Sequence, residues 1–473
     1  MNVGELSVHR SGSRQSLKRL ARRQVATLSL AGLVMLLVTA AALAVTGDLS
    51  QPAGTAGCVS ETGAGPCADG RGLEFATGVA VSPDGKSLYA VSSFISHAVV
   101  RFNRDPATGW IAQPAGAGGC VSQFGAEPCA DGHALGYLTG VAVSPDGKSV
   151  YVSSGSTAAV VRLNRNPTTG AISQPVGSAG CISETGNNGA CADGRGLKFP
   201  TGVAVSPDGK SVYVASTTSD AVVRLVRNPT TGAISQPAGT AGCISEDGRG
   251  PCADGHGLFG PEKVVVSPDG KSVYVASYIS NAVARLVRNP TTGAISQPAG
   301  STGCVSEDGT GPCADGHGLG LPGGVAMSAD GKSVYAASSA SNAVARLVRN
   351  PTTGALSQPA GTAGCVSEDG TGPCADGHGF DGPYGVAVSP DGKSVYVTSS
   401  ASDAVARLDR NTTNGAISQP AGTTGCVSET GSGLCTDGRG LDQPFGVTVS
   451  PDGNSVYVAS NASDAVARFN RAP

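Results

Sequence analysis

Three things that the sequence lacks narrow its fold and its function. No helical periodicity is visible after residue 46, and the composition there, rich in Gly, Ser, Thr and Val with regular Pro and Gly turns, is typical of all-β proteins. No linker or shift in composition interrupts those residues, so further domains are not expected. Positive charge is also scarce. Without residues 1–44 the chain has 26 basic and 34 acidic residues, a net charge of −8, which argues against nucleic acid as a partner.

What the chain does contain is one unit repeated seven times, with a period of 61 or 62 residues. The fifth unit shows four candidate strands, at 324–328, 333–338, 343–349 and 355–358, separated by turn sequences rich in Asp, Gly and Asn. A four-stranded sheet of this size cannot bury both faces alone, whereas seven sheets around one axis can. The repeat therefore predicts an all-β, seven-bladed β-propeller of four-stranded antiparallel blades.

The two ends of the repeat predict how the ring closes. Residues 47–52 match 415–420, a fourth strand, whereas the chain finishes at 465–470, a third strand. We therefore expect the N-terminal strand to complete the last blade, which removes a free sheet edge. The propeller is expected to span residues 47–473.

The N-terminal segment differs from the repeats. Residues 1–24 form a basic leader with six Lys and Arg, and residues 25–46 are an uncharged run rich in Leu, Ala and Val. The basic leader and the uncharged run together predict a signal peptide or a membrane anchor. The length of the run favours an anchor, and the A-x-A pattern at 42–44 favours cleavage, so both interpretations stay open. In either case we expect the repeats to be exported, either extracellular or anchored to the outer side of the cytoplasmic membrane.

All 14 cysteines lie in the repeats, two in each unit. An even, periodic set in an exported chain predicts one disulfide within each unit. Zinc is the alternative, but the C-x2-C pairs or interspersed histidines that usually mark zinc sites are absent, so no metal site is predicted. The predicted pairs are Cys58–Cys67, Cys120–Cys129, Cys181–Cys191, Cys243–Cys252, Cys304–Cys313, Cys365–Cys374 and Cys426–Cys435.

Each cysteine loop ends in Cys-Ala-Asp-Gly, or a close variant, followed by Arg or His, and in six units a Glu follows the first cysteine by three residues. A ring of carboxylates, Arg and imidazole groups would suit a polar ligand, a glycan or Ca²⁺. In the alternative interpretation Asp-Gly forms a turn, Glu accepts hydrogen bonds from backbone amides and the cation pairs with the Asp. The candidate ligand-binding cations are Arg71, His133, Arg195, His256, His317, His378 and Arg439.

Departures from the repeat point to a second candidate site. Glu262 and Lys263 replace the Thr-Gly or Phe-Gly pair that opens other inner strands, and Tyr384 and Phe445 take the position of Glu262 in two later units. A lysine at the mouth of a propeller channel costs free energy unless it is paired or used. A functional patch around these four residues is therefore a hypothesis, although the sequence identifies no catalytic residue.

Three repeated polar positions are predicted to be structural. Asp146 and its equivalents lie in tight Ser-Pro-Asp-Gly turns. The tyrosines of the second strands, such as Tyr89, are expected in the core. The third-strand arginines, such as Arg101, are expected to bridge neighbouring blades.

The segment Val-Ala-Val-Ser-Pro-Asp-Gly-Lys-Ser-Val-Tyr-Val at 141–152 resembles the YVTN-type propeller repeat. Over 47–473 the seven units resemble the lactonase-type seven-bladed propeller superfamily, which includes surface-layer and secreted binding proteins, sugar-lactone hydrolases and carboxymuconate-type cyclases. The resemblance implies that the connections between blades, here the cysteine loops, rim one mouth of the channel. This chain departs from the family by its cysteine loops, and no lactonase catalytic set falls on a motif here.

These features favour a monomeric binding platform for a polar polymer, a glycan or a protein partner, with no membrane contact beyond the N-terminal segment. No cofactor is expected, apart from Ca²⁺ if the loops bind it. One alternative is a lactonase-like hydrolase in the central funnel, which needs a unique acid–base or metal cluster. Another is a purely structural wall component, and the fold alone does not choose between them.

Overall fold

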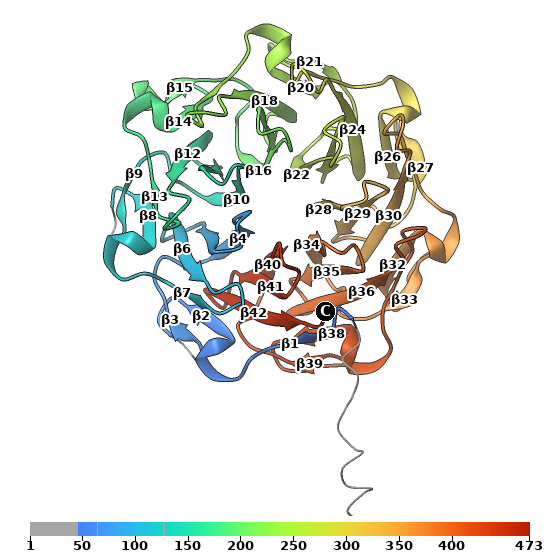
Figure 1. Cartoon of the computed structure of the whole chain (residues 1–473). Coiled ribbons are helices and arrows are strands. Elements are labelled where there is room, and N and C mark those ends of the chain that lie inside the picture. Colours follow the sequence, from blue (N-terminus) through green and yellow to red (C-terminus); the bar gives the residue numbers. More distant parts are fainter. Residues whose placement is uncertain (1–45, 64, 126–127) are drawn as a thin grey trace, which may run out of the picture. The chain divides into compact units, whose positions relative to one another are not determined.

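Each repeat folds into one twisted sheet, and seven such sheets surround a central axis (Figure 1). The computed structural model describes residues 46–63, 65–125 and 128–473. The predicted basic leader (1–24) and nearly all of the predicted signal peptide or anchor (25–46) lie outside these residues. Among the described residues, no helix has the length and apolar character needed to cross a bilayer.

The first strand of each blade lines the axis. These strands are β4 (Ala76–Val81), β10 (Leu138–Val143), β16 (Pro200–Val205), β22 (Pro261–Val266), β28 (Pro322–Met327), β34 (Pro383–Val388) and β40 (Pro444–Val449). A tight turn then reverses the chain, as at Asp146, whose carboxylate accepts a 2.5 Å hydrogen bond from the hydroxyl of Ser144. Gly147 closes that turn at φ +66°, a backbone conformation that glycine adopts without strain.

The second and third strands form the buried middle of each blade. The second strands are β5 (Ser87–Ser92), β11 (Ser149–Ser154), β17 (Ser211–Ser216), β23 (Ser272–Ser277), β29 (Ser333–Ser338), β35 (Ser394–Ser399) and β41 (Ser455–Ser460). The third strands are β6 (Ala98–Arg104), β12 (Ala159–Arg165), β18 (Ala221–Arg227), β24 (Ala282–Arg288), β30 (Ala343–Arg349), β36 (Ala404–Arg410) and β42 (Ala465–Arg471). Every residue of the second strands is buried, because each blade is packed between two neighbours.

The hydrophobic core lies between the blades. Tyr89 and Val91 of the first blade pack in one cluster with Val150 and Val152 of the second. The same pairing of neighbours recurs around the ring. A single blade therefore has no core of its own, which is the physical reason why the repeat needs to close into a ring.

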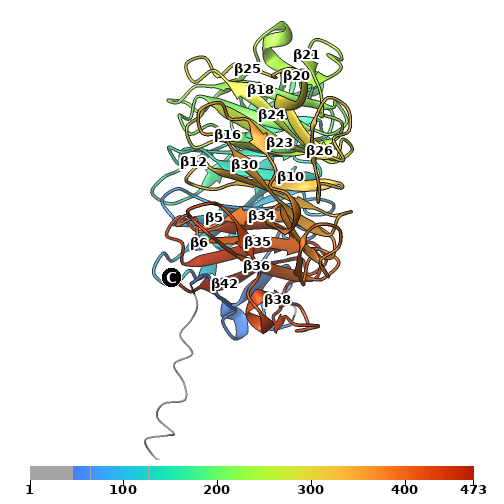
Figure 2. The same ribbon diagram turned by 90° about the vertical axis from the view of Figure 1, so that its right-hand side faces the viewer.

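The outer part of each blade differs from the prediction of a single fourth strand. Two short strands take its place, both antiparallel to the third strand, and a further strand runs parallel to the second of them. Each blade therefore has six strands instead of four. The break has a local cause, since the first short strand is followed by Gln-Pro and proline has no N–H with which to continue the ladder. In Figure 2 the strands of the sixth blade follow one another toward the outer edge.

The outer strands before the break are β1 (Leu49–Ser50), β7 (Ile111–Ala112), β13 (Ile172–Ser173), β19 (Ile234–Ser235), β25 (Ile295–Ser296), β31 (Leu356–Ser357) and β37 (Ile417–Ser418). Those after it begin at the first cysteine: β2 (Cys58–Ser60), β8 (Cys120–Gln123), β14 (Cys181–Ser183), β20 (Cys243–Glu246), β26 (Cys304–Glu307), β32 (Cys365–Glu368) and β38 (Cys426–Ser428). The parallel strands are β3 (Ala68–Asp69), β9 (Ala130–Gly132), β15 (Ala192–Asp193), β21 (Ala253–Gly255), β27 (Ala314–Gly316), β33 (Ala375–Gly377) and β39 (Thr436–Asp437).

Short 3-10 helices connect the outer strands. They are η1 (Gly54–Ala56), η2 (Gly116–Gly119), η3 (Gly177–Gly180), η4 (Gly186–Gly189), η5 (Gly239–Gly242), η6 (Gly300–Thr302), η7 (Gly361–Ala363) and η8 (Gly422–Gly425).

The ring closes as the sequence predicts. β1, β2 and β3 from the start of the described chain join β40, β41 and β42 from its end in one sheet. Leu49 pairs with Arg471, and Cys58 pairs with Ala467. The N-terminal segment thus supplies three strands of the last blade, two more than expected, because the cysteine strands belong to the blade as well.

Candidate functional site

The seven predicted disulfides are all present, but the loops that they close are not at the channel mouth. Strands such as β14, β20 and β26 lie at the periphery of the ring, three strands away from the channel (Figure 1). The expectation that the cysteine loops rim the channel is therefore wrong. It failed because the first half of each loop pairs with the third strand and so becomes part of the outer edge.

The cations of these loops join neighbouring blades. The backbone N–H of His256 donates to Gln297 Oε1 at 2.7 Å, and Gln297 Nε2 donates back to the carbonyl of His256 at 2.7 Å. The side chain of Arg71 likewise donates to the carbonyl of Pro114 in the next blade at 2.7 Å. Similar backbone contacts hold His133, Arg195, His317 and His378 against the following blade, and Gln51 bonds the carbonyl of Arg439.

The glutamates of the loops cap backbone amides, as the structural alternative predicts. Glu246 Oε2 accepts a 2.5 Å hydrogen bond from the N–H of Leu258, and Glu184 accepts one from Leu197 at 2.6 Å. The cations, in contrast, contact the next blade instead of the loop Asp. The seven cations thus lie apart from each other, one in each blade junction, and their role as ligand-binding residues stays a prediction.

A cavity of about 160 Å³ occupies the channel, and only inner-strand residues line it. All seven blades contribute, through residues at the second to fourth positions of their first strands. Six blades have glycine at the third position, because the inner strands pack closely there. A Cβ on Gly140 would lie 2.7 Å from the carbonyl oxygen of Thr201, which is closer than real Cβ contacts. In the fourth blade, Lys263 takes the place of this glycine.

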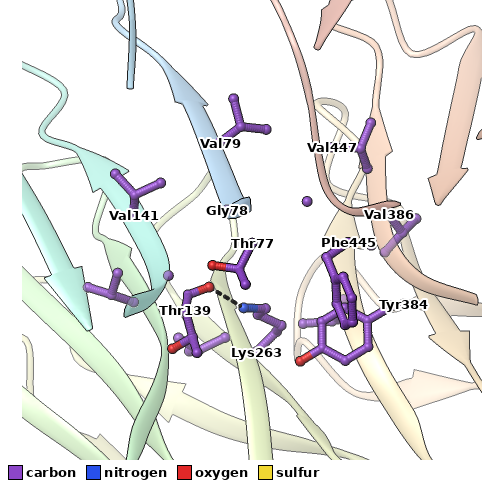
Figure 3. Close-up of a pocket in the computed structure, with 17 residues that line it drawn as sticks. Thr77, Gly78, Val79, Thr139, Val141, Lys263, Tyr384, Val386, Phe445 and Val447 are labelled. Atoms are coloured by element: carbon purple, nitrogen blue, oxygen red, sulfur yellow. Dashed lines mark hydrogen bonds between the residues drawn. The ribbon is translucent and has the colours of Figure 1, made fainter. Parts of the chain in front are cut away.

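The side chain of Lys263 crosses from β22 toward the second and third blades (Figure 3). Its Nζ donates to the carbonyl oxygens of Thr139 at 3.0 Å and Thr201 at 3.4 Å. It also lies 5.9 Å from the ring centre of Tyr384, within range of a cation–π interaction. Burial lowers the pKa of Lys263, and the nearby Glu262 carboxylate only partly opposes this.

Glu262 connects three blades through its carboxylate. The hydroxyl of Tyr384 donates to Glu262 Oε2 at 3.2 Å, and Thr217 Oγ1 donates to Oε1 at 3.4 Å. Burial raises the pKa of Glu262, against the opposing effects of Lys263 and of these hydrogen bonds. The pKa of Tyr384 is raised well above its ordinary value, by burial first and then by the negative charge of Glu262.

Aromatic rings complete one side of the cavity. Tyr384 and Phe445 pack edge to face with ring centres 5.0 Å apart (Figure 3). Gly323 makes room for the phenol, since a Cβ there would lie 2.7 Å from the Tyr384 ring. The structure therefore brings together all four residues of the predicted patch, from the fourth, sixth and seventh blades.

Sequence reasoning missed the polar partners of this cluster. Thr139, Thr201 and Thr217 look like ordinary strand residues, because a hydroxyl or carbonyl carries no sequence signal for what it faces. Within residues 46–63, 65–125 and 128–473, no group of three or more His, Cys, Asp or Glu side chains is placed to hold a metal ion.

The predicted structural residues have the expected roles. Tyr151 is buried, and its hydroxyl donates to the carbonyl of Gly232 in the next blade at 2.6 Å. Arg162, a third-strand arginine, donates to the carbonyl of Thr231, also in the next blade. A second arginine per blade was not predicted to matter. Arg227, at the end of β18, donates to Tyr151 at 2.8 Å and to both carboxylate oxygens of Asp146 in the preceding blade.

Comparison with known proteins supports the fold and no more. No protein-family model matches the chain, and no curated protein matches it. Among solved structures, the periplasmic gluconolactonase of Pseudomonas aeruginosa is similar over 75% of this chain and 86% of its own, with 18% identity and a TM-score of 0.50. A protein from Lactobacillus plantarum (19% identity, 72% and 83% covered, TM-score 0.48) and the hydrazine synthase of Kuenenia stuttgartiensis (19%, 85% and 96%, 0.47) are also similar. What the chain is similar to is thus a fold, the seven-bladed β-propeller found in lactonase-like proteins.

Proposed function

We propose that the protein binds a small polar organic molecule in the central channel, at the cluster of Glu262, Lys263, Tyr384 and Phe445. One observation carries the proposal: side chains that break the sevenfold repeat in three separate blades converge on one cavity. A half-buried ammonium and a half-buried carboxyl group cost free energy, and the glycine found in six blades at the position of Lys263 avoids the cost of the ammonium. The cavity wall offers a ligand one cation and two aromatic rings, and the carboxylate of Glu262 lies beside them, bonded to the Tyr384 hydroxyl.

The chemistry of the cluster defines the class of ligand. Lys263 can donate to a carboxylate or carbonyl oxygen, Glu262 can bind a hydroxyl, and the rings cover an apolar face. A small hydroxy acid, sugar acid or lactone has these features. We further propose that binding takes place outside the cytoplasm, because seven disulfides indicate an oxidising compartment.

Hydrolysis of a lactone is the second candidate function for the same cavity. It is supported by a carboxyl group whose pKa is raised next to an amine whose pKa is lowered, since shifts in these directions are typical of groups that act in acid–base catalysis. The gluconolactonase among the similar structures is a further reason to test it. Binding of a surface polymer or a partner protein by the outer loops stays a separate prediction.

Lys263→Met tests the binding function. Sugar acids, hydroxy acids and their lactones would be screened against the oxidised protein by thermal shift, and hits measured by calorimetry. We expect Lys263→Met to weaken a hit at least tenfold, because a charged hydrogen bond contributes about 1.5–3 kcal/mol. The matched control is Lys271→Met, which removes an exposed lysine from a turn of the same blade. Equal affinity in the wild type and Lys263→Met would overturn the proposal, and titration of released acid would detect hydrolysis.

A further inference from the structure

Four aromatic side chains form a continuous row across the first three blades. Phe75 and Phe94 belong to the first blade, Tyr137 to the second and Phe199 to the third. Successive ring centres lie 5.5, 4.7 and 5.2 Å apart. We call these four residues the aromatic row.

The aromatic row lies at the end of the channel that holds Lys263. Phe75, Tyr137 and Phe199 directly precede the inner strands β4, β10 and β16. Phe75 and Tyr137 are each two residues from a threonine that lines the cavity, Thr77 and Thr139 respectively. Burial and, to a smaller extent, the negative charge of Glu262 raise the pKa of Tyr137. Through β10 the row is thus linked to the cavity wall, since Tyr137 precedes this strand and Thr139 of the same strand lines the cavity.

The backbone gives no structural reason for aromatic residues here. This position has positive φ in every blade: +56° at Phe75, +53° at Tyr137 and +55° at Phe199, but also +62° at Gly260 and +66° at Gly382. Glycine meets the requirement without strain in two blades, whereas a bulky residue in this conformation costs free energy. The other two blades have Leu321 at +53° and Gln443 at +50°, so the conformation does not itself require an aromatic ring.

The chain also makes specific room for the row. The turn that carries Phe94 has five residues between its strands, where the other six blades have four. The extra residue lets Phe94 contact Tyr137 of the next blade. Gly155 provides space for the ring of Phe199, since a Cβ there would lie 3.1 Å from it. Yet Phe94 is 56% exposed and the adjacent Ile95 62% exposed, so this apolar surface still faces solvent.

We propose that the aromatic row and Ile95 bind the apolar tail of the ligand whose polar head occupies the channel cavity. The inference rests on the proposed function and adds the ligand class, an amphiphilic acid or lactone with an acyl or aryl tail. Five neighbouring side chains with a single hydroxyl among them offer almost no hydrogen bonds, so they match an apolar tail better than a polar one.

Two homologous series test the proposal: straight-chain carboxylates from butanoate to dodecanoate, and γ-lactones from γ-butyrolactone to γ-dodecalactone. Affinities for the full-length protein would be measured by calorimetry below the critical micelle concentrations. We expect the affinity of the wild type to rise about three- to fourfold per methylene, as burial of each CH₂ predicts. In Phe94→Ala/Ile95→Ala the increase per methylene should fall by about half, with the shortest ligands unchanged. Both side chains are exposed, so their removal should not disturb folding. The milder variant Phe94→Leu repeats the test in case the double variant does not fold.

Trp110→Ala is the matched control, because Trp110 is a 49% exposed aromatic residue in a turn between a third and a fourth strand. It should leave every affinity unchanged.

Binding that depends on Lys263 but not on tail length would overturn the tail site and leave the proposed function intact. A tail-length effect that persists in Phe94→Ala/Ile95→Ala would overturn it too, as would the failure of both series to bind. Long tails that bind equally well to Lys263→Met would show that the row acts independently of the cavity, which also contradicts the proposal.

Discussion

At the scale of single residues, one contact repeated seven times holds the blades together. The last arginine of each third strand reaches into the preceding blade and pairs with the Asp of its first turn and the Tyr of its second strand. The arginine side chains are at most 3% exposed. The seven ion pairs are Arg104–Asp452, Arg165–Asp84, Arg227–Asp146, Arg288–Asp208, Arg349–Asp269, Arg410–Asp330 and Arg471–Asp391.

Asp146→Asn tests the electrostatic part of this contact. Burial by itself would raise the pKa of Asp146, but hydrogen bonds from Ser144, Arg227 and the N–H of Lys148 outweigh it and lower the pKa. A carboxyl group with a lowered pKa stabilises the folded state fully above its unfolded pKa of about 3.9, and this stability is lost as pH falls through the folded pKa. We expect the variant to be about 1.5–3 kcal/mol less stable at pH 7 by urea unfolding, with the difference shrinking below about pH 4.

The exposed Asp437→Asn serves as its control and should match the wild type at each pH. A stability difference between wild type and Asp146→Asn that stays constant from pH 7 to pH 3 would contradict this account.

At the scale of elements, the outer edge of each blade depends on its disulfide. β26 has only four residues and β27 only three, and Cys304–Cys313 closes the loop between them. Such short strands make few ladder hydrogen bonds, so the cross-link compensates by limiting the freedom of the unfolded loop. The glutamate cap from Glu307 to the N–H of Leu319 holds the far end of the same loop.

Cys304→Ser/Cys313→Ser measures that compensation. The chain-entropy relation for a loop of about ten residues gives a loss of about 2–3 kcal/mol in the free energy of unfolding. Guanidinium unfolding of the oxidised protein would detect it, with Thr310→Ala in the same loop as a control that keeps the cross-link. An unchanged free energy of unfolding would mean that the outer strands are stable without the disulfide.

At the scale of the whole molecule, the shared core between blades makes ring closure a condition of stability. The first described residues meet the end of the chain. Tyr396 donates to the carbonyl of Gly47 at 2.7 Å, Arg407 pairs with Asp48, and the N–H of Gly47 donates to Ala472 at 2.8 Å. Without this segment β42 would be an exposed edge strand, a template for association with other chains.

Removal of residues 46–69 tests closure. A chain of 70–473 should associate and lose its cooperative unfolding transition, whereas a chain of 46–473 should stay monomeric. Light scattering after size-exclusion chromatography and urea unfolding would distinguish them. A monodisperse, equally stable 70–473 chain would show that six complete blades suffice.

Much of this architecture could be predicted from the sequence. The period of 61 or 62 residues determines the number of blades, the cysteine spacing determines each disulfide, and the matching end segments determine the closure, because these features depend on order along the chain. The interior position of Tyr89 and the turn at Asp146 follow in the same way from local patterns.

Other features were decided only by the tertiary structure. The break of the outer strand carried the cysteine loops to the periphery, which no spacing revealed. The channel cluster also depends on the ring, because Glu262 and Tyr384 are 122 positions apart and meet only when inner strands of non-adjacent blades surround one axis. A repeat determines the blades by local signals, whereas a site on the axis depends on side chains from several blades at once, and their meeting is a property of the closed ring.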